Sequence, residues 1–98
     1  MQYLVIVRLK PDADQAKIIS LAKPEAAKAW EMMASGVLRS IHFIKGPVGA
    51  ALLFEAGDQK AVEGKVAELP LVASDLAAVE VLPLVPFTGW ELLFATAT

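Results

Sequence analysis

The sequence contains no cysteine and a single histidine, His42. Without cysteine the chain has no disulfide framework, no thiolate nucleophile and no cysteine-based metal site. One histidine also excludes a multi-histidine metal site within one chain, and the carboxylates are not clustered along the sequence. The sequence has no Gly-rich phosphate loop, nucleophile elbow or helical metal motif. We therefore expect the protein to work without a cofactor or a bound metal.

The sequence also lacks a long apolar run and a basic stripe. Its uncharged stretches, such as 46–54 and 81–90, are shorter than the ~20 apolar residues that span a bilayer, and proline interrupts both. The first eight residues have no basic leader and no small-residue cleavage site, so they predict a strand and not a signal peptide. We therefore expect a cytoplasmic protein that binds neither membrane nor nucleic acid.

Apolar residues are abundant and make up 56% of the 98 residues. Globular chains average roughly 45 to 50% apolar residues, and a chain of this length forms one domain with a small core. Part of the surplus is therefore expected to contact a second copy, as a homodimer or higher homo-oligomer. Charge is uneven, because residues 66–98 hold four acidic and no basic side chains, whereas residues 1–65 hold nine basic and seven acidic ones. This asymmetry favours contact between opposite ends of two chains.

Periodicity and capping signals predict four strands and two helices. Pro24 suits the first turn of a helix, where Glu25 lies near the positive end of the helix dipole, and Gly36 suits its end. Asp58 is a good cap for the second helix. Residues 15–23 are ambiguous between a loop and a helical turn. The predicted elements are strands at 1–9, 37–44, 50–55 and 77–82, and helices at 24–35 and 59–69.

This β-α-β-β-α-β order is the ferredoxin-like arrangement of an α+β domain, with two helices on one face of an antiparallel sheet. The strands carry apolar residues at both parities, for example Leu4 and Ile6 beside Tyr3 and Val5. The face without helices therefore also needs a cover. We expect an identical chain to supply it by two-fold symmetry, so that two sheets face each other in a dimeric α+β barrel.

The end of the chain is expected to leave this domain. Residues 1–98 are predicted to form a single ferredoxin-like domain in which residues 86–98 are a C-terminal tail. Trp90 and Phe94 in this tail expose large apolar groups unless a surface receives them. We therefore expect the tail to dock on a partner subunit.

The phrase Leu-Pro-Leu-Val occurs twice, at 69–72 and 82–85, and proline suits it to mark the ends of regular elements. With the residues around it, the phrase carries a family resemblance. From Ser35 to Leu84 the chain resembles the muconolactone isomerase family, a branch of the dimeric α+β barrel proteins. The matching residues are Arg39, Gly46, Phe54, Leu69-Pro70-Leu71, Val79-Glu80-Val81 and Pro83-Leu84. A more divergent group of that family shares patterns like Glu25-Ala26-Ala27, Trp30-Glu31 and Pro86-Phe87.

The resemblance implies a small pocket between the sheet and the helices, with cofactor-free, isomerase-like acid-base chemistry on a small organic acid or lactone. Two positions differ from the isomerases, which have a His where this chain has Ser40 and a second Arg where it has Phe43. Two other functions stay open. One is a non-catalytic module for small-ligand binding or assembly, and the other is a cofactor-free oxygenase of the same fold.

Three residues are candidates for this chemistry. Glu80 interrupts an apolar strand, where a buried carboxylate suits proton transfer, although an ion pair with Arg8 on the first strand is the alternative. Histidine changes charge near neutral pH, so His42 is the second candidate for proton transfer, unless it is simply exposed on an edge strand. Arg39 can bind a substrate carboxylate through its planar guanidinium group. Strict alternation puts Arg39 and His42 on opposite faces of the sheet unless a bulge intervenes.

Two further residues have structural interpretations. Glu55 ends the third strand before a turn and is expected to be solvated. Trp30 falls on the apolar stripe of the first helix together with Ala26 and Met33, so we expect it to be a core residue.

Overall fold

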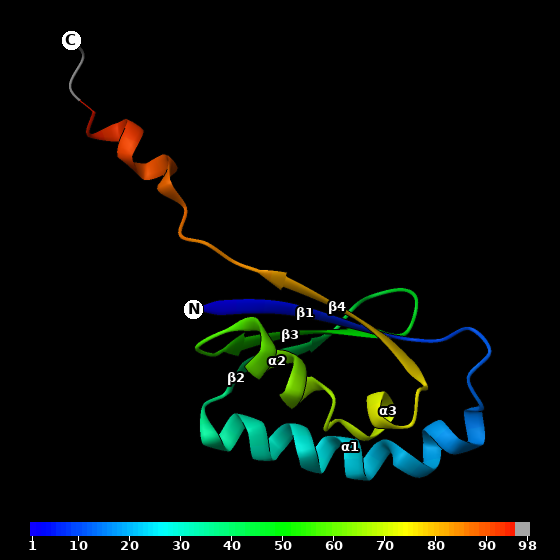
Figure 1. Cartoon of the computed structure of the whole chain (residues 1–98). Coiled ribbons are helices and arrows are strands. Elements are labelled where there is room, and N and C mark those ends of the chain that lie inside the picture. Colours follow the sequence, from blue (N-terminus) through cyan, green and yellow to red (C-terminus); the bar gives the residue numbers. More distant parts are fainter. Residues whose placement is uncertain (96–98) are drawn as a thin grey trace.

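The computed structural model describes residues 1–95 of the chain. A four-stranded antiparallel sheet forms the centre, in the order β2-β3-β1-β4, and the helices pack on one face of it (Figure 1). This arrangement confirms the predicted ferredoxin-like α+β fold with its second strand at an edge. The elements are β1 (Gln2–Leu9), α1 (Gln15–Ser35), β2 (Leu38–Phe43), β3 (Gly49–Glu55), α2 (Gln59–Val66), α3 (Pro70–Ala73), β4 (Ala77–Pro83) and the 3-10 helix η1 (Thr88–Leu93).

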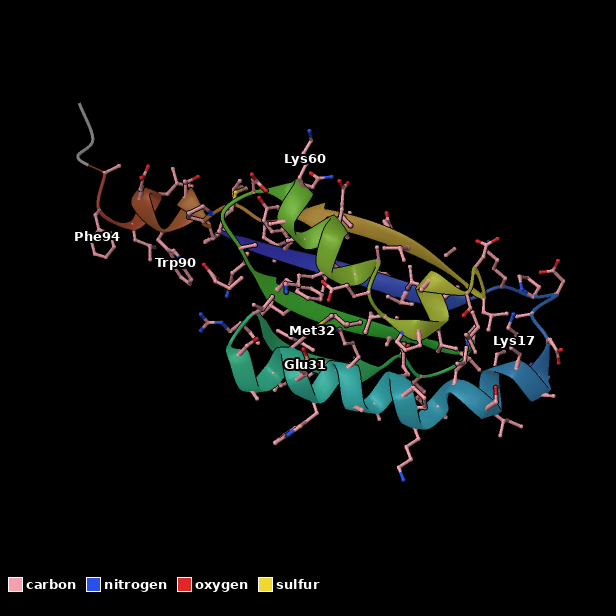
Figure 2. All side chains as sticks on the ribbon, turned by 60° about the horizontal axis from the view of Figure 1, so that its bottom comes forward. Lys17, Glu31, Met32, Lys60, Trp90 and Phe94 are labelled. Carbon is pink, nitrogen blue, oxygen red and sulfur yellow. The ribbon has the colours of Figure 1, made fainter. Side chains whose placement is uncertain are left out.

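The core lies between the helices and one face of the sheet. Phe54 on β3 is its largest fully buried side chain, and Met32 is the buried residue of α1, which Figure 2 shows between the helix and the sheet. Asp58 caps α2 by accepting a hydrogen bond from the Ala61 amide at 2.8 Å, as predicted. Val62 and Val66 on α2 and Leu69 just after it belong to this core and are each at most 2% exposed.

Helix α1 is longer than predicted and continues through Pro24. Its true N-cap is Asp14, whose side chain accepts a hydrogen bond from the Ala16 amide at 3.0 Å. Its C-cap is Gly36 with φ of 83°, as predicted. Proline inside a helix removes one hydrogen bond and costs about 3 kcal/mol. The apolar stripe nevertheless continues on both sides of Pro24, with Ile18 and Ala22 before it and Ala26 and Ala29 after it.

The first Leu-Pro-Leu phrase begins a helix and does not end one. Helix α2 ends at Val66, three residues earlier than predicted, and Pro70 then occupies the first position of the one-turn helix α3. Proline suits that position because its fixed φ is helical and its missing amide hydrogen is not needed there.

Among the described residues, no helix covers the second face of the sheet (Figure 1). After β4 the chain leaves the domain, and Trp90 and Phe94 on this tail lie far from the sheet (Figure 2). The radius of gyration is 16.6 Å, against about 13 Å for a compact chain of this size. The predicted tail spans residues 86–98, of which 96–98 lie outside the described residues. None of the helices within residues 1–95 is long and apolar enough to cross a membrane.

Candidate functional site

A cavity of about 630 Å³ lies between α1 and the helix-covered face of the sheet. Cavities of this size, mostly apolar and with a few polar groups, are typical of sites for small organic ligands. Two of its lining residues are titratable, Glu25 on α1 and His42 on β2. The other lining residues are Val7, Leu9, Ile18, Ala22, Ala26, Ala29, Trp30, Met33, Ile41, Phe43, Val48, Gly49, Ala50, Leu52, Leu69 and Leu71.

The cavity exists because small side chains face each other across it. On α1 the lining residues follow helical spacing, and three of them are alanines, Ala22, Ala26 and Ala29. Ala50 faces this helix from β3, and Gly49 beside it also lines the cavity. Larger residues elsewhere hold α1 and β3 at a normal packing distance. A void therefore remains where both elements carry side chains of one carbon or none.

Glu25 is half-buried in the wall of this cavity. Its Oε1 accepts a hydrogen bond from the Leu71 amide at 2.9 Å, which fixes the carboxylate against α3. Burial raises the pKa of Glu25, and the hydrogen bond from Leu71 opposes this effect to a smaller extent. A carboxyl group whose pKa moves toward neutrality in an apolar cavity is suited to accept and return a proton.

The Leu-Pro-Leu phrase supplies this hydrogen bond. Leu69 caps α3 without a side-chain hydrogen bond, and Pro70 has no amide hydrogen to donate. The Leu71 amide is therefore the first backbone amide of this turn that can donate a hydrogen bond. It donates to the carboxylate of Glu25, which lies 46 residues earlier in the sequence. Leu69 and Leu71 also line the cavity, so the phrase forms one wall and orients the carboxylate.

The structure separates the predicted proton-transfer residues. Glu80 is exposed on β4 opposite Ile6, on the sheet face without helices. His42 is exposed on β2 opposite Ala51, which places its side chain on that same face, and on this edge strand the residue is also among those that line the cavity. Both residues lie in one row across the sheet but at opposite edges, so within one chain they do not share a site.

Arg39 lies at a bulge in β2, between Leu38 and Ser40. The bulge changes the alternation, and the positive charge of Arg39 helps to lower the pKa of Glu55, after the larger effect of the hydrogen bond from the Met1 amino group at 2.8 Å. The two residues are therefore neighbours at one end of the sheet. Glu55, expected to be solvated, is half-buried and ion-paired.

The predicted core role of Trp30 is wrong. The predicted stripe of Ala26, Trp30 and Met33 does face the sheet, but it lines the cavity, and Trp30 is 73% exposed. At this position the facing residues are too small or too distant to cover an indole. Trp30 therefore lies at the rim of the cavity, as does Phe43, which is 91% exposed.

A second, smaller groove of about 330 Å³ lies between α2 and β4. Its carboxylate, Glu63, is exposed and accepts a hydrogen bond from the side-chain amide of Gln59 at 3.3 Å. No titratable group is half-buried there, so this groove is the weaker candidate for chemistry.

Filling the cavity is expected to abolish ligand binding without unfolding the protein. The variant Ala26→Leu adds three carbons on the cavity side of α1, and overfilling typically costs about 1 to 3 kcal/mol. We expect the dissociation constant of a cavity ligand to rise at least about tenfold. The matched control is Ala27→Leu, the next residue of the same helix, which does not line the cavity. Calorimetric titration of both variants checks this expectation, and equal affinities would contradict it.

The fold and the cavity define a class of proteins, the ferredoxin-like α+β domains with a ligand cavity between helix and sheet. Comparison with known proteins narrows this class. The family model of muconolactone delta-isomerase matches residues 1–88, and the chain belongs to that family. A search of curated protein sequences found no match.

Two solved structures are similar over most of their length. The crystal structure of muconolactone isomerase aligns with a TM-score of 0.76 and 24% identity, covering 91% of this chain and 93% of that one. A 5-chloro-2-hydroxyhydroquinone dehydrochlorinase from Burkholderia phenoliruptrix AC1100, in complex with 2,5-dihydroxybenzoquinone, aligns with a TM-score of 0.73 and 19% identity, covering 87% and 94%. These likenesses confirm the fold. Family membership supports an isomerase-like enzyme that acts on a small molecule, without specifying the reaction.

Proposed function

We propose that this protein is a cofactor-free acid-base enzyme that moves a proton within a small, largely apolar organic acid or lactone. The observation that carries the proposal is the half-buried Glu25 in the wall of an apolar cavity, held by the Leu71 amide. The cavity has space for a compact ring system, and the lining residues other than Glu25 and His42 are apolar or glycine. Membership of the muconolactone delta-isomerase family supports the same class of reaction.

The proposed step is a proton shift beside a carbonyl. Ionised Glu25 removes a proton from the carbon next to the carbonyl group, and the electron pair of that C–H bond moves into a conjugated enolate. The protonated Glu25 then returns the proton at the far end of the conjugated system, so that a double bond changes position and no atom is gained or lost. One carboxyl group is sufficient because both positions lie on one face of a small ring.

One polar residue near the mouth has a binding role in this proposal. His42 is a lining residue on the edge strand β2, whereas Arg39 lies near the start of that strand and is not among the lining residues, so His42 is placed to meet an anionic group at the open end of the substrate. The apolar ring then points inward, toward Glu25. Glu80 cannot reach this cavity within one chain, so its proposed part in proton transfer requires a second copy.

Hydrogen exchange in D₂O tests the proposed reaction. The protein is incubated with a panel of small unsaturated lactones that includes muconolactone, and NMR follows both the shift of the double bond and deuterium uptake at the carbon atoms that lose and receive the proton. We expect uptake with at least one lactone and no consumption of oxygen. Binding without deuterium uptake would favour a non-catalytic ligand-binding module, and oxygen consumption with an electron-rich aromatic substrate would favour an oxygenase. Either result overturns the proposal.

We also propose that the protein self-associates through the sheet face without helices and through the tail. Apolar side chains lie on this face at partial exposure, including Leu4, Ile6 and Leu53. The tail adds exposed aromatic groups, among them Trp90 at 63% and Phe94 at 83%. A single chain that leaves both surfaces in water carries more exposed apolar area than is usual for a monomer.

A further inference from the structure

The cavity is long and narrow. Its lining residues on α1 run from Ile18 to Met33, which at 1.5 Å per residue is about 22 Å of helix. Over this length, the volume of about 630 Å³ corresponds to a mean cross-section of roughly 30 Å². A cavity of these proportions suits a ligand that is one ring or one hydrocarbon chain thick and several times longer than it is wide.

A lactone without substituents leaves most of this cavity empty. Liquid water takes up about 30 Å³ per non-hydrogen atom, so a ligand of about ten such atoms fills at most roughly 300 Å³. That is less than half of the cavity volume of about 630 Å³. Apolar walls that contact no ligand atom gain no dispersion energy from binding. The remaining volume is therefore expected to hold a further part of the substrate.

Glu25 lies near the middle of this length. Ile18, Ala22, Glu25 and Ala29 recur every three or four residues, so they form one row along α1. The spacing in sequence places about 10 Å of helix between Glu25 and Ile18, and about 12 Å between Glu25 and Met33. A substrate whose carbonyl group lies at Glu25 can therefore extend in either direction along the helix.

The two directions along α1 end differently. Ala29 and Met33 are partly buried and pack against the hydrophobic core, so the cavity meets the core toward the C-terminal end of this helix. In the other direction the wall continues as Ala22 and Ile18, toward the start of α1, which Lys17 marks in Figure 2. An elongated substrate therefore extends from Glu25 toward the start of α1.

The sheet lines this direction with aliphatic side chains. Leu9 at the end of β1 and Val48 before β3 both line the cavity, and the Leu9 amide donates a hydrogen bond to the Val48 carbonyl at 3.3 Å. Val48 is 62% exposed, so this end of the cavity reaches solvent. Within the described part of the chain, the lining residues include no lysine or arginine that could bind a second carboxylate. A hydrocarbon arm fits these walls, whereas a second charged group does not.

We propose that the substrate carries an unbranched aliphatic arm that extends from the carbonyl group at Glu25, past Ala22, to Ile18. The distance of about 10 Å corresponds to roughly six to eight carbon atoms of an extended chain, at a C–C bond length of about 1.5 Å. Longer arms leave the cavity at this end and enter water. The inference rests on the proposed acid-base function for the position of the carbonyl group, whereas the arm itself is bound by the apolar walls.

Calorimetric titration with saturated γ-lactones tests the arm without requiring turnover. The γ-alkyl group is lengthened one carbon at a time, from methyl to decyl. We expect the dissociation constant to fall about two- to fourfold for each added methylene group that the cavity buries. The fall should stop at about eight carbon atoms, because further methylene groups stay in water. An affinity that does not depend on arm length, or that rises steadily to the longest arm, overturns the proposal.

Ile18→Trp is the variant designed to block the arm, because it adds an indole at the far end of the row. We expect its dissociation constant for the octyl lactone to rise at least about tenfold, with a change of less than about twofold for the methyl lactone. The matched control is Ile19→Trp, since Ile19 is 72% exposed and does not line the cavity. The control should leave both affinities unchanged, and an equal effect of the two variants would also overturn the proposal.

Failure of this proposal and failure of the proposed acid-base function give different results. Deuterium uptake by unsaturated lactones with a kcat/KM that is independent of arm length would overturn the arm and leave the acid-base function intact. Affinity that depends on arm length as expected, without deuterium uptake by any lactone, would support the arm and overturn the acid-base function.

Discussion

The Glu25→Gln variant is expected to lose between 10²- and 10⁴-fold in the rate of deuterium uptake, the usual range for removal of a general acid-base group. Glutamine keeps an oxygen that can accept the hydrogen bond from the Leu71 amide, so the wall of the cavity stays in place. It cannot accept a proton at that oxygen in the reaction. The loss should therefore fall on the turnover rate, with little change in ligand affinity.

Stability measurements separate this effect from unfolding. Burial raises the pKa of Glu25, so the folded protein binds a proton there more tightly than the unfolded chain does. Ionisation of Glu25 consequently lowers stability as the pH rises through the window between the ordinary and the raised pKa. Above that window the Glu25→Gln variant should be at least as stable as the parent protein. An inactive variant that is also stable identifies a chemical role.

Glu31→Gln is the matched control for this experiment. Glu31 lies on the same helix, is exposed, and contacts Lys28 at 3.4 Å. We expect its rate to equal that of the parent protein within a factor of two or so, since surface pairs of this kind contribute about 0 to 1 kcal/mol. If Glu25→Gln retained the parent rate, or if both variants lost activity equally, Glu25 would not be the proton-transfer group.

The second large effect is expected on stability, in the variant Phe54→Ala. Phe54 is fully buried near the end of β3, opposite Tyr3 on β1 and Leu38 on β2. Truncation of a buried phenylalanine to alanine costs about 3 to 5 kcal/mol, which is a large part of the roughly 5 to 15 kcal/mol that stabilises a domain. At about 4 to 8 °C per kcal/mol for a domain of this size, Tm should fall by at least about 12 °C.

Phe43→Ala is the control for this variant, because it makes the same change on the neighbouring strand. Phe43 is 91% exposed and lines the cavity mouth. Its truncation should change Tm by only a few degrees and act instead on ligand affinity. Thermal unfolding followed by circular dichroism checks both variants. Equal losses of stability would show that the core is not where the structure places it.

The fold was largely predictable from the sequence because its signals are local. Strand alternation, the Asp58 cap and the Gly36 cap each depend on a few neighbouring residues, and each prediction was confirmed. The bounds of α1 were not predictable in this way. Pro24 is a strong local signal for a helix start, but the helix begins nine residues earlier, at Gln15, where Asp14 caps it.

Because the helix was predicted to start at Pro24, Glu25 was not predicted to line a cavity. A helix beginning at Pro24 makes Glu25 a first-turn residue whose charge is explained by the helix dipole. In the 21-residue helix that the structure shows, Glu25 instead lies between Ala22 and Ala29 on the apolar stripe. A lone carboxylate on such a stripe is the same kind of pattern as Glu80 on its apolar strand, and it is present in the sequence.

The contacts of these two carboxylates depend on long-range geometry. Glu25 meets an amide 46 residues away, a partner that no local pattern specifies. Glu80 lies on an apolar strand, but on the face that a single chain leaves uncovered. Whether an interrupting carboxylate is buried therefore depends on which face receives the helices, and alternation alone does not decide that.

Carbon-13 NMR titration of the glutamate side chains measures whether Glu25 in the cavity is a carboxyl group prepared for proton transfer. We predict a pKa for Glu25 above the ordinary glutamate value, because burial outweighs the hydrogen bond from Leu71. Glu68 provides an internal control in the same spectra, since its hydrogen bond with Lys28 lowers its pKa. A Glu25 pKa at or below the ordinary value, with Glu68 lowered as expected, would contradict the account.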